Sequence, residues 1–168
     1  MAISPYVRRL RDALGPARLL FPSVAGLVRA DGGRLLLVQN RDDGSWTTPG
    51  GAIEVDETPA TAVVREVWEE TGLFVTPRRV FGVYGGPRFL VRYDNGDESQ
   101  YISTMFDCEI VSGEPRPDGD ETMAVRFLTL DEASRLPLSP WLVDVLPRLY
   151  DVASPPWFEP TAWRPSAD

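Results

Sequence analysis

Three glutamates, Glu66, Glu69 and Glu70, stand at positions i, i+3 and i+4 of a segment with helical periodicity. At about 100° per residue, this spacing places all three carboxylates on one face of a helix. Like charges at these spacings repel one another, and a single neighbouring arginine, Arg65, cannot neutralise three acids. Bound divalent cations could do so, and carboxylate-rich sites suit Mg2+, which also binds substrate phosphates.

The types of residue that are missing narrow the chemistry further. The 168 residues include no histidine and one cysteine, Cys108. The absence of histidine excludes Ser-His-Asp and Cys-His catalysis and the common zinc sites that use imidazole. A metal must then be held by oxygen ligands, which favours hard cations such as Mg2+ or Mn2+. We interpret Cys108 as a small residue on a strand, and a lone cysteine agrees with a reducing compartment.

A glycine-containing loop, Pro49-Gly50-Gly51, precedes the acidic segment. Such a backbone can approach a ligand closely and offer a carbonyl as one more hard oxygen ligand. Each feature also has an ordinary explanation, because acidic helix faces are commonly just solvated and Gly-Gly usually marks a turn. From these residues alone, both interpretations stay open.

The helix that carries the glutamates is predicted over 59–71. Thr58 suits its N-cap, Pro59 its first turn and Gly72 the left-handed position after its end. Its apolar side is expected to pack on a sheet, and this side comprises Ala60, Val63, Val64, Val67 and Trp68.

The remaining elements predict an α/β sandwich with a mixed sheet, because strands and helices alternate without a βαβ rhythm. Helices are expected over 4–14, 131–133 and 139–150, with Pro147 kinking the last or ending it early. Strands are expected over 25–28, 35–38, 80–84, 89–93, 100–110 and 124–130. We divide the chain into an N-terminal helical extension (1–19), a main domain (20–152) and a tail containing Pro and Trp (153–168).

The tail, with four prolines, is predicted to be irregular. Its aromatic residues are expected to lie against the body or against a second subunit, and the second alternative would make the protein a homodimer.

Charge and hydrophobicity limit the partners. Acidic residues outnumber basic ones 25 to 17, and no basic run is present, which argues against polymeric nucleic acid. A small anionic substrate remains compatible, since a bound cation reverses the local field. No stretch reaches the roughly 18–20 apolar residues of a membrane span, and the N-terminus lacks a signal-peptide centre, so we predict a cytoplasmic protein.

At this point the segment resembles a known motif, the Nudix box of the Nudix hydrolase superfamily. All its fixed positions are matched, by Gly51, Glu57, Arg65, Glu66, Val67, Glu69, Glu70, Gly72 and Leu73. The resemblance covers roughly residues 20 to 150. It implies an α/β/α sandwich with a mixed sheet and a pyrophosphohydrolase activity. The implied substrate is a nucleoside diphosphate linked to another moiety: a nucleoside triphosphate, ADP-ribose or a nucleotide sugar. The alternative is a non-catalytic nucleotide-binding or regulatory domain of the same fold.

The resemblance also implies roles for residues. Glu66, Glu69, Glu70 and the carbonyl of Gly50 would bind Mg2+ or Mn2+, and Glu66 would alternatively orient the attacking water. Arg65 would hold the glutamates, and Glu57 would support them from behind. Relatives often add an acid from a downstream loop, for which we favour Glu121, with Glu98 as the alternative.

Residues outside the motif are expected to select the substrate. Trp46 either stacks on a base or fills the core, and Arg41 either binds a phosphate or is a solvated loop residue. Tyr84 and Phe89 either line a pocket or pack between strands.

Overall fold

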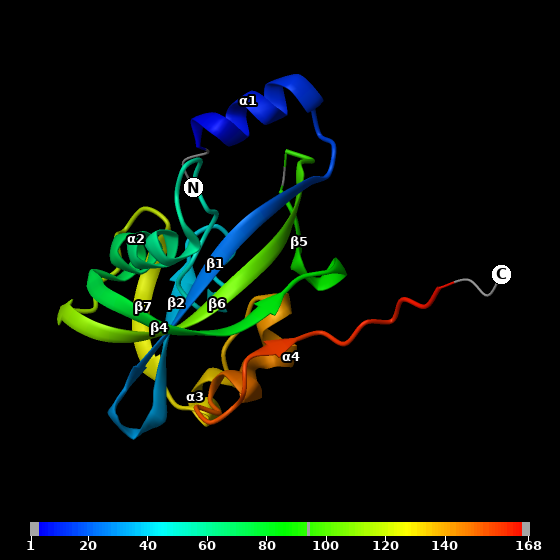
Figure 1. The fold of residues 1–168 in the computed structure, drawn as a ribbon. Coiled ribbons are helices and arrows are strands. Elements are labelled where there is room, and N and C mark those ends of the chain that lie inside the picture. Colours follow the sequence, from blue (N-terminus) through cyan, green and yellow to red (C-terminus); the bar gives the residue numbers. More distant parts are fainter. Residues whose placement is uncertain (1–3, 94, 166–168) are drawn as a thin grey trace.

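The computed structural model of this chain describes residues 4–93 and 95–165. Residues 1–3, 94 and 166–168, which include the outer ends of the predicted extension and tail, lie outside the described residues. The elements, labelled in Figure 1 where there is room, are α1 (Pro5–Leu14), β1 (Leu19–Ala30), η1 (Asp31–Gly33), β2 (Arg34–Asn40), β3 (Trp46–Thr47), α2 (Pro59–Thr71), β4 (Leu73–Tyr84), η2 (Pro87–Phe89), β5 (Leu90–Arg92), β6 (Glu98–Gly113), β7 (Thr122–Leu128), α3 (Leu130–Ala133), α4 (Pro140–Leu149) and β8 (Trp157–Phe158).

The strands form a mixed sheet, as predicted. Its order is β3-β2-β1-β6-β4-β8, with β5 added beside β6 and β7 beside β2. Strand β1 runs parallel to β6, and β8 runs parallel to β4, whereas the other pairs are antiparallel. The connection from β1 to β2 is a tight turn at Asp31-Gly32-Gly33, and Gly32 adopts the positive φ that such a turn needs.

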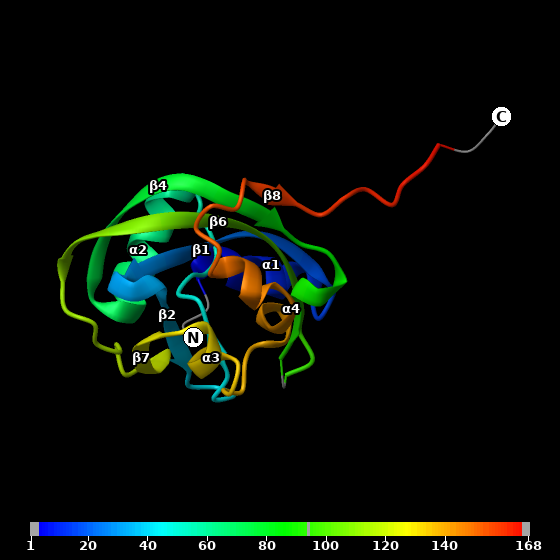
Figure 2. The same cartoon turned by 90° about the horizontal axis from the view of Figure 1, so that it is seen from below.

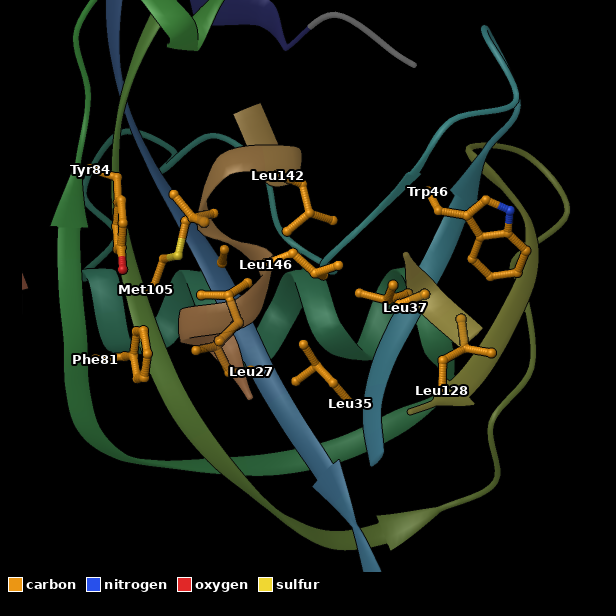
Figure 3. Packing of buried hydrophobic residues seen from close by; sticks show 14 of the residues in the cluster. Leu27, Leu35, Leu37, Trp46, Phe81, Tyr84, Met105, Leu128, Leu142 and Leu146 are labelled. Carbon is orange, nitrogen blue, oxygen red and sulfur yellow. The ribbon is translucent and has the colours of Figure 1, made fainter. Parts of the chain in front are cut away.

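Helices cover both faces of the sheet, which confirms the α/β sandwich (Figures 1 and 2). On one face, Val63 and Val67 of α2 pack with Val24 and Phe106 of the sheet. On the other face, α3 and α4 enclose the larger cluster shown in Figure 3, which includes Leu27, Leu35, Leu37, Phe81, Met105, Leu128, Leu142 and Leu146. The site described below lies at one edge of α2.

Four strands, β1, β2, β4 and β6, are longer than the sequence predicts. The strand predicted over 80–84 is the last part of β4, which begins at Leu73 and passes through Pro77. The pairing of β4 with β6 shifts between Pro77 and Arg79, so the proline lies at an irregularity of the ladder, where the loss of its N–H is tolerated. Phe89, predicted to start a strand, instead ends a short 3-10 turn before β5.

Helix α2 begins and ends at the predicted residues. The Thr58 hydroxyl accepts a hydrogen bond from the Thr61 amide, and Gly72 takes the left-handed conformation with φ 70°. Its buried side matches the prediction at Val63 and Val67, but it also includes Ala62, Glu70 and Thr71, whereas Ala60 is exposed and Trp68 is 47% exposed. The buried stripe lies further round the helix because α2 turns Glu70 towards the loop at residue 50 and leaves Trp68 at the rim.

Helix α1 lies at one end of the sheet (Figure 1) and has no buried residue. Its Arg11 nevertheless ties it to the body, because this side chain donates to the Glu98 carbonyl (2.8 Å) and to the Ser99 hydroxyl (3.0 Å). No helix within residues 4–93 and 95–165 is long and apolar enough to cross a membrane.

The prediction of an irregular tail is wrong at Trp157–Phe158, which form β8 beside β4. The prolines before these residues do not prevent pairing at an outer edge, where one side of the strand needs no partner. Trp157 stacks on Tyr84 with ring centroids 4.8 Å apart, as the predicted docking of the tail requires. Trp163 is 74% exposed, and Figure 2 shows the chain after β8 extending away from the body. Helix α4 includes Pro147 and continues to Leu149, so the proline does not end it early.

The C-terminal segment is also held by charge. Asp107 on β6 pairs with both Arg29 and Arg79. The same two guanidinium groups donate to main-chain carbonyls near the C-terminus: Arg29 to that of Leu149, and Arg79 to those of Val152 and Ser154. The cluster therefore joins β1, β4 and β6 to the chain that follows α4.

Cys108 is buried on β6, as expected for a structural cysteine. Burial raises the pKa of its thiol to about 12, and the neighbouring Asp107 carboxylate acts in the same direction. Because the thiolate is the reactive form, we expect Cys108 to resist iodoacetamide at pH 8 in the folded protein and to react after denaturation. Mass spectrometry of the alkylated chain tests this, and rapid labelling of the native protein would contradict it.

Candidate active site

The glycine loop is fixed to strand β1 by main-chain hydrogen bonds. The amide of Val24 donates to the Gly51 carbonyl (2.9 Å), and the amide of Gly26 donates to the Pro49 carbonyl (2.8 Å). These bonds hold the loop against the sheet, next to the middle of α2. The loop is therefore a rigid part of the site and not a free surface turn.

Gly50 and Gly51 are needed for different reasons. A Cβ atom on Gly50, whose φ is 154°, would overlap the Val24 carbonyl oxygen and lie 2.7 Å from the Ala25 Cα. A Cβ atom on Gly51 would instead lie 2.6 Å from a carboxylate oxygen of Glu66. The first glycine thus allows two backbones to approach each other, and the second makes room for a glutamate of α2.

Arg65 connects the acidic residues of the site. Its guanidinium donates to both carboxylate oxygens of Glu57 (2.9 Å each) and to Glu66 (2.8 Å) and Glu69 (3.0 Å). It also donates to the Ala52 carbonyl (3.1 Å), so it binds the loop as well as the helix. The hydrogen bonds from Arg65 hold the pKa of Glu57 below its usual value. This arrangement has the form predicted for Arg65 and Glu57.

Glu66 and Glu70 have unusual electrostatic surroundings. Burial raises the pKa of Glu66 to about 7 against the opposing charge of Arg65, and the carboxylates of Glu69 and Glu121 raise it further. Burial also raises the pKa of Glu70 well above its usual value, with repulsion from Glu66 as the next cause. Glu70 accepts one hydrogen bond from the Gly50 amide (3.1 Å). The site thus concentrates more negative charge than its own cations compensate.

The loop after β6 brings a further acid to this place. Glu121 and Asp118 are both close enough to act on the charge of Glu70. Asp118 shapes the loop: burial acts to raise its pKa, but the amides of Asp120, Glu121 and Thr122 donate to it and hold that pKa below its usual value. The hydroxyl of Thr122 donates to the Glu70 carbonyl (3.0 Å), which joins the loop to α2.

The other predicted residues lie apart from the carboxylates or act indirectly. Arg41 donates to the Gly119 carbonyl, and its amide donates to the Glu121 carbonyl (2.9 Å), so it supports the acidic loop. The structure buries Trp46, Tyr84 and Phe89 in the cluster of Figure 3, which favours packing over contact with a base. Glu98, the alternative to Glu121, is paired with Arg18 and Arg92.

The types and places of these residues fit a divalent cation. Besides the carboxylates, the loop offers the carbonyl of Gly50: hydrogen bonds within residues 4–93 and 95–165 reach the carbonyls of Pro49, Gly51 and Ala52 but not this one. In the same described residues, no group of three or more acidic side chains is already arranged to hold a metal ion. Arg65 and the Gly50 amide instead hold the carboxylates of Glu66, Glu69 and Glu70, each through one oxygen.

Sequence reasoning missed two features of this region. Asp118 lies in the same loop as the predicted Glu121, but its role in shaping that loop follows only from its hydrogen bonds. Trp68 was predicted to pack on the sheet and is exposed beside the site. The sequence does carry a sign that Trp68 has a separate role. It occupies a variable position of the motif, directly before Glu69, where the fixed pattern requires no aromatic residue.

Comparison with known proteins decides the family. The NUDIX domain family profile matches residues 19–149, which is most of the chain and includes the loop, α2 and the acidic loop. The chain belongs to the Nudix hydrolase family. Members of this family act on small nucleotide substrates and generally use divalent metal ions.

Individual relatives agree with this assignment. The Nudix chain is 39% identical over 129 residues to a MutT-like protein of Streptomyces ambofaciens, covering 77% of this chain and 76% of that protein. It is 33% identical over 138 residues to an ADP-ribose pyrophosphatase of Methanocaldococcus jannaschii, covering 79% and 77%. The crystal structure of a MutT protein from Methanosarcina mazei superposes with a TM-score of 0.65 at 25% identity, covering 79% of this chain and 94% of that one.

Proposed function

We propose that this Nudix hydrolase cleaves the phosphoanhydride bond of a nucleoside diphosphate that is linked to a second moiety. The observation that supports this most directly is the concentration of Glu66, Glu70 and Glu121 around the glycine loop, with too little positive charge to compensate them. Such a cluster is not expected where the residues have a structural role alone, because each buried carboxylate costs free energy unless a positive charge neutralises it.

The residues divide the work as follows. Glu66, Glu69, Glu70 and the carbonyl of Gly50 would hold Mg2+ or Mn2+, which supplies charge neutralisation at the diphosphate and lowers the pKa of a water molecule. Arg65 positions Glu66 and Glu69 through its hydrogen bonds, and Glu57 fixes Arg65 from the other side. Glu121 accepts the proton of the attacking water at its carboxylate, because it is close enough to Glu66 and Glu70 to act on their charge.

The substrate class follows from the chemistry and from the relatives. An ADP-ribose pyrophosphatase and MutT-like proteins are among the relatives, and each of these names fits hydrolysis of a nucleotide with a diphosphate link. We propose ADP-ribose, a nucleoside triphosphate or a nucleotide sugar as the substrate.

The test is a product assay with ADP-ribose, dGTP, an oxidised dGTP and UDP-glucose, each with Mg2+, with Mn2+ and with excess chelator. We expect turnover of at least one substrate and the loss of that turnover in chelator. Without a divalent cation, the negatively charged carboxylates repel the negatively charged diphosphate. Hydrolysis in H2(18)O followed by mass spectrometry then shows which phosphorus the water attacks. Turnover that is unaffected by chelator, or none with any of the four substrates, would contradict the proposal.

A further inference from the structure

A groove of about 420 Å3 opens beside the acidic helix face, and of the residues that line it only Glu69 has a part in the mechanism above. It is lined by Trp68, Glu69, Gly72, Arg116, Pro117 and Asp118. A second hollow of about 300 Å3 continues past Trp68 and Arg116 towards Pro115. Glu69, a proposed metal ligand, and Asp118 of the acidic loop place one end of the groove next to the proposed reaction centre.

Trp68 is the first feature that points to a ligand. It occupies the last turn but one of α2 with 47% of its surface exposed, although the apolar positions Val63 and Val67 of the same helix are fully buried. A large aromatic side chain contributes most when its face is covered. Here the uncovered indole lies next to the groove, where a planar group can stack on it.

Arg116 is the second feature. Its amide donates to the Thr71 carbonyl (2.8 Å), which fixes the backbone of this residue at the end of α2. Its side chain lies so closely over Gly72 that a Cβ there would be 2.9 Å from the Arg116 Cγ and 3.1 Å from its Nε. Gly72 therefore both ends the helix and makes room for a guanidinium group on the floor of the groove.

We propose that this groove binds the nucleoside part of the substrate, with its base stacked on Trp68 and a phosphate oxygen held by Arg116. The placing of the diphosphate at the Glu69 end rests on the proposed function. A guanidinium forms strong paired hydrogen bonds with phosphate oxygens, and stacking accepts any base because every base has an aromatic face. Trp68 and Arg116 thus determine binding, whereas the glutamates perform the reaction.

The test compares ADP with inorganic pyrophosphate, which carries a diphosphate without a nucleoside. Calorimetric titration of the full chain in Mg2+ measures binding, because neither ADP nor pyrophosphate is a nucleoside diphosphate linked to a second moiety, the proposed substrate class. We expect Trp68→Ala to weaken ADP binding about tenfold and to leave pyrophosphate binding unchanged, because only ADP has a base to stack. Trp68→Phe keeps an aromatic face and should stay within about threefold of the wild type. Arg116→Ala should weaken both ligands, since both offer phosphate oxygens.

Trp163→Ala is the matched control, because Trp163 is also exposed (74%) and lies in the extended tail. Equal ADP affinity of Trp68→Ala and Trp163→Ala would overturn the proposal, as would a wild type that binds no ADP at millimolar concentration. On any substrate that is turned over, Trp68→Ala should raise KM and leave kcat nearly unchanged. Trp68-dependent ADP binding without hydrolysis of any substrate would refute the proposed function alone, whereas turnover with an unchanged KM would refute the groove alone.

Discussion

Replacement of Glu70 by glutamine should lower kcat/KM at least about a hundredfold without destabilising the metal-free protein. The loss of activity is expected because one negative ligand disappears from a site that must neutralise a diphosphate in the transition state, and removal of one such group usually costs 10²–10³. Glutamine keeps the shape of the side chain and can still accept the hydrogen bond from the Gly50 amide.

The stability part of this prediction follows from the raised pKa of Glu70. Its folded-state pKa lies well above the usual value of 4.5, so the folded protein binds more protons than the unfolded chain. Stability contributed by the protonated group is present below pH 4.5 and is lost as the pH rises through the folded pKa. The metal-free wild type should therefore lose stability as the pH rises above 4.5, and Glu70→Gln should lose less, because its side chain stays neutral.

Thermal unfolding in chelator at several pH values, together with steady-state kinetics in Mg2+, checks both parts. Glu109→Gln is the control, since Glu109 is an exposed glutamate of β6 that pairs with the exposed Arg78. It should change neither activity nor the pH dependence of unfolding. A Glu70→Gln variant with more than half the wild-type activity would remove Glu70 from the catalytic machinery.

The local structure around this site is predictable because its signals lie in neighbouring residues. Thr58, Pro59 and Gly72 determine both ends of α2 by hydrogen bonds and backbone conformation that involve only the adjacent turns. The spacing of Glu66, Glu69 and Glu70 likewise follows from helix geometry alone. The positions of the core strands are predictable for the same reason, because runs of apolar residues in the sequence mark them.

The orientation of α2 was not predictable, because it depends on what the helix packs against. A stripe centred on Val63 and Val67 fits either neighbour, Trp68 or Glu70, on its buried side. Hydrophobicity alone favours burial of the tryptophan, but the Gly50 amide in the fixed loop donates a hydrogen bond to the Glu70 carboxylate. Burial of a charged group against hydrophobic preference is the kind of local conflict that marks a functional site.

Contacts between residues far apart in the chain could not be predicted from the sequence either. The two arginines that share Asp107 come from β1 and β4, far apart in the chain. Strand β8 similarly depends on an edge of β4 that is created only when the sheet has formed. A tail with several prolines carries no local signal for such pairing, so its regular part appears only in the structure.

Replacement of Gly50 by alanine should lower both stability and activity, because its Cβ would overlap the main chain of β1. The Val24 carbonyl and the Ala25 Cα belong to a buried strand and cannot move aside, and the φ of 154° is also unfavourable for alanine. We expect a loss of about 1–3 kcal/mol, as for other overpacked sites, which corresponds to roughly 3–10 °C in Tm. Activity should fall more than tenfold, since the displaced loop takes its carbonyl and the Glu70 contact with it.

Two further glycine variants make this prediction specific. In Gly51→Ala the new atom meets the Glu66 carboxylate, the mobile end of a side chain, so the unfolding temperature should change little while activity falls. In Gly85→Ala the atom nearest to the new Cβ is 3.6 Å away, which is an ordinary contact. The free energy of unfolding should stay within about 0.5 kcal/mol of the wild type, and the activity should not change. Calorimetry and kinetics on the three proteins separate a rigid backbone contact from a displaced carboxylate. If Gly50→Ala unfolds at the same temperature as Gly85→Ala, the loop is not held against β1 as the structure shows, and the Gly50 carbonyl loses its fixed place beside the glutamates.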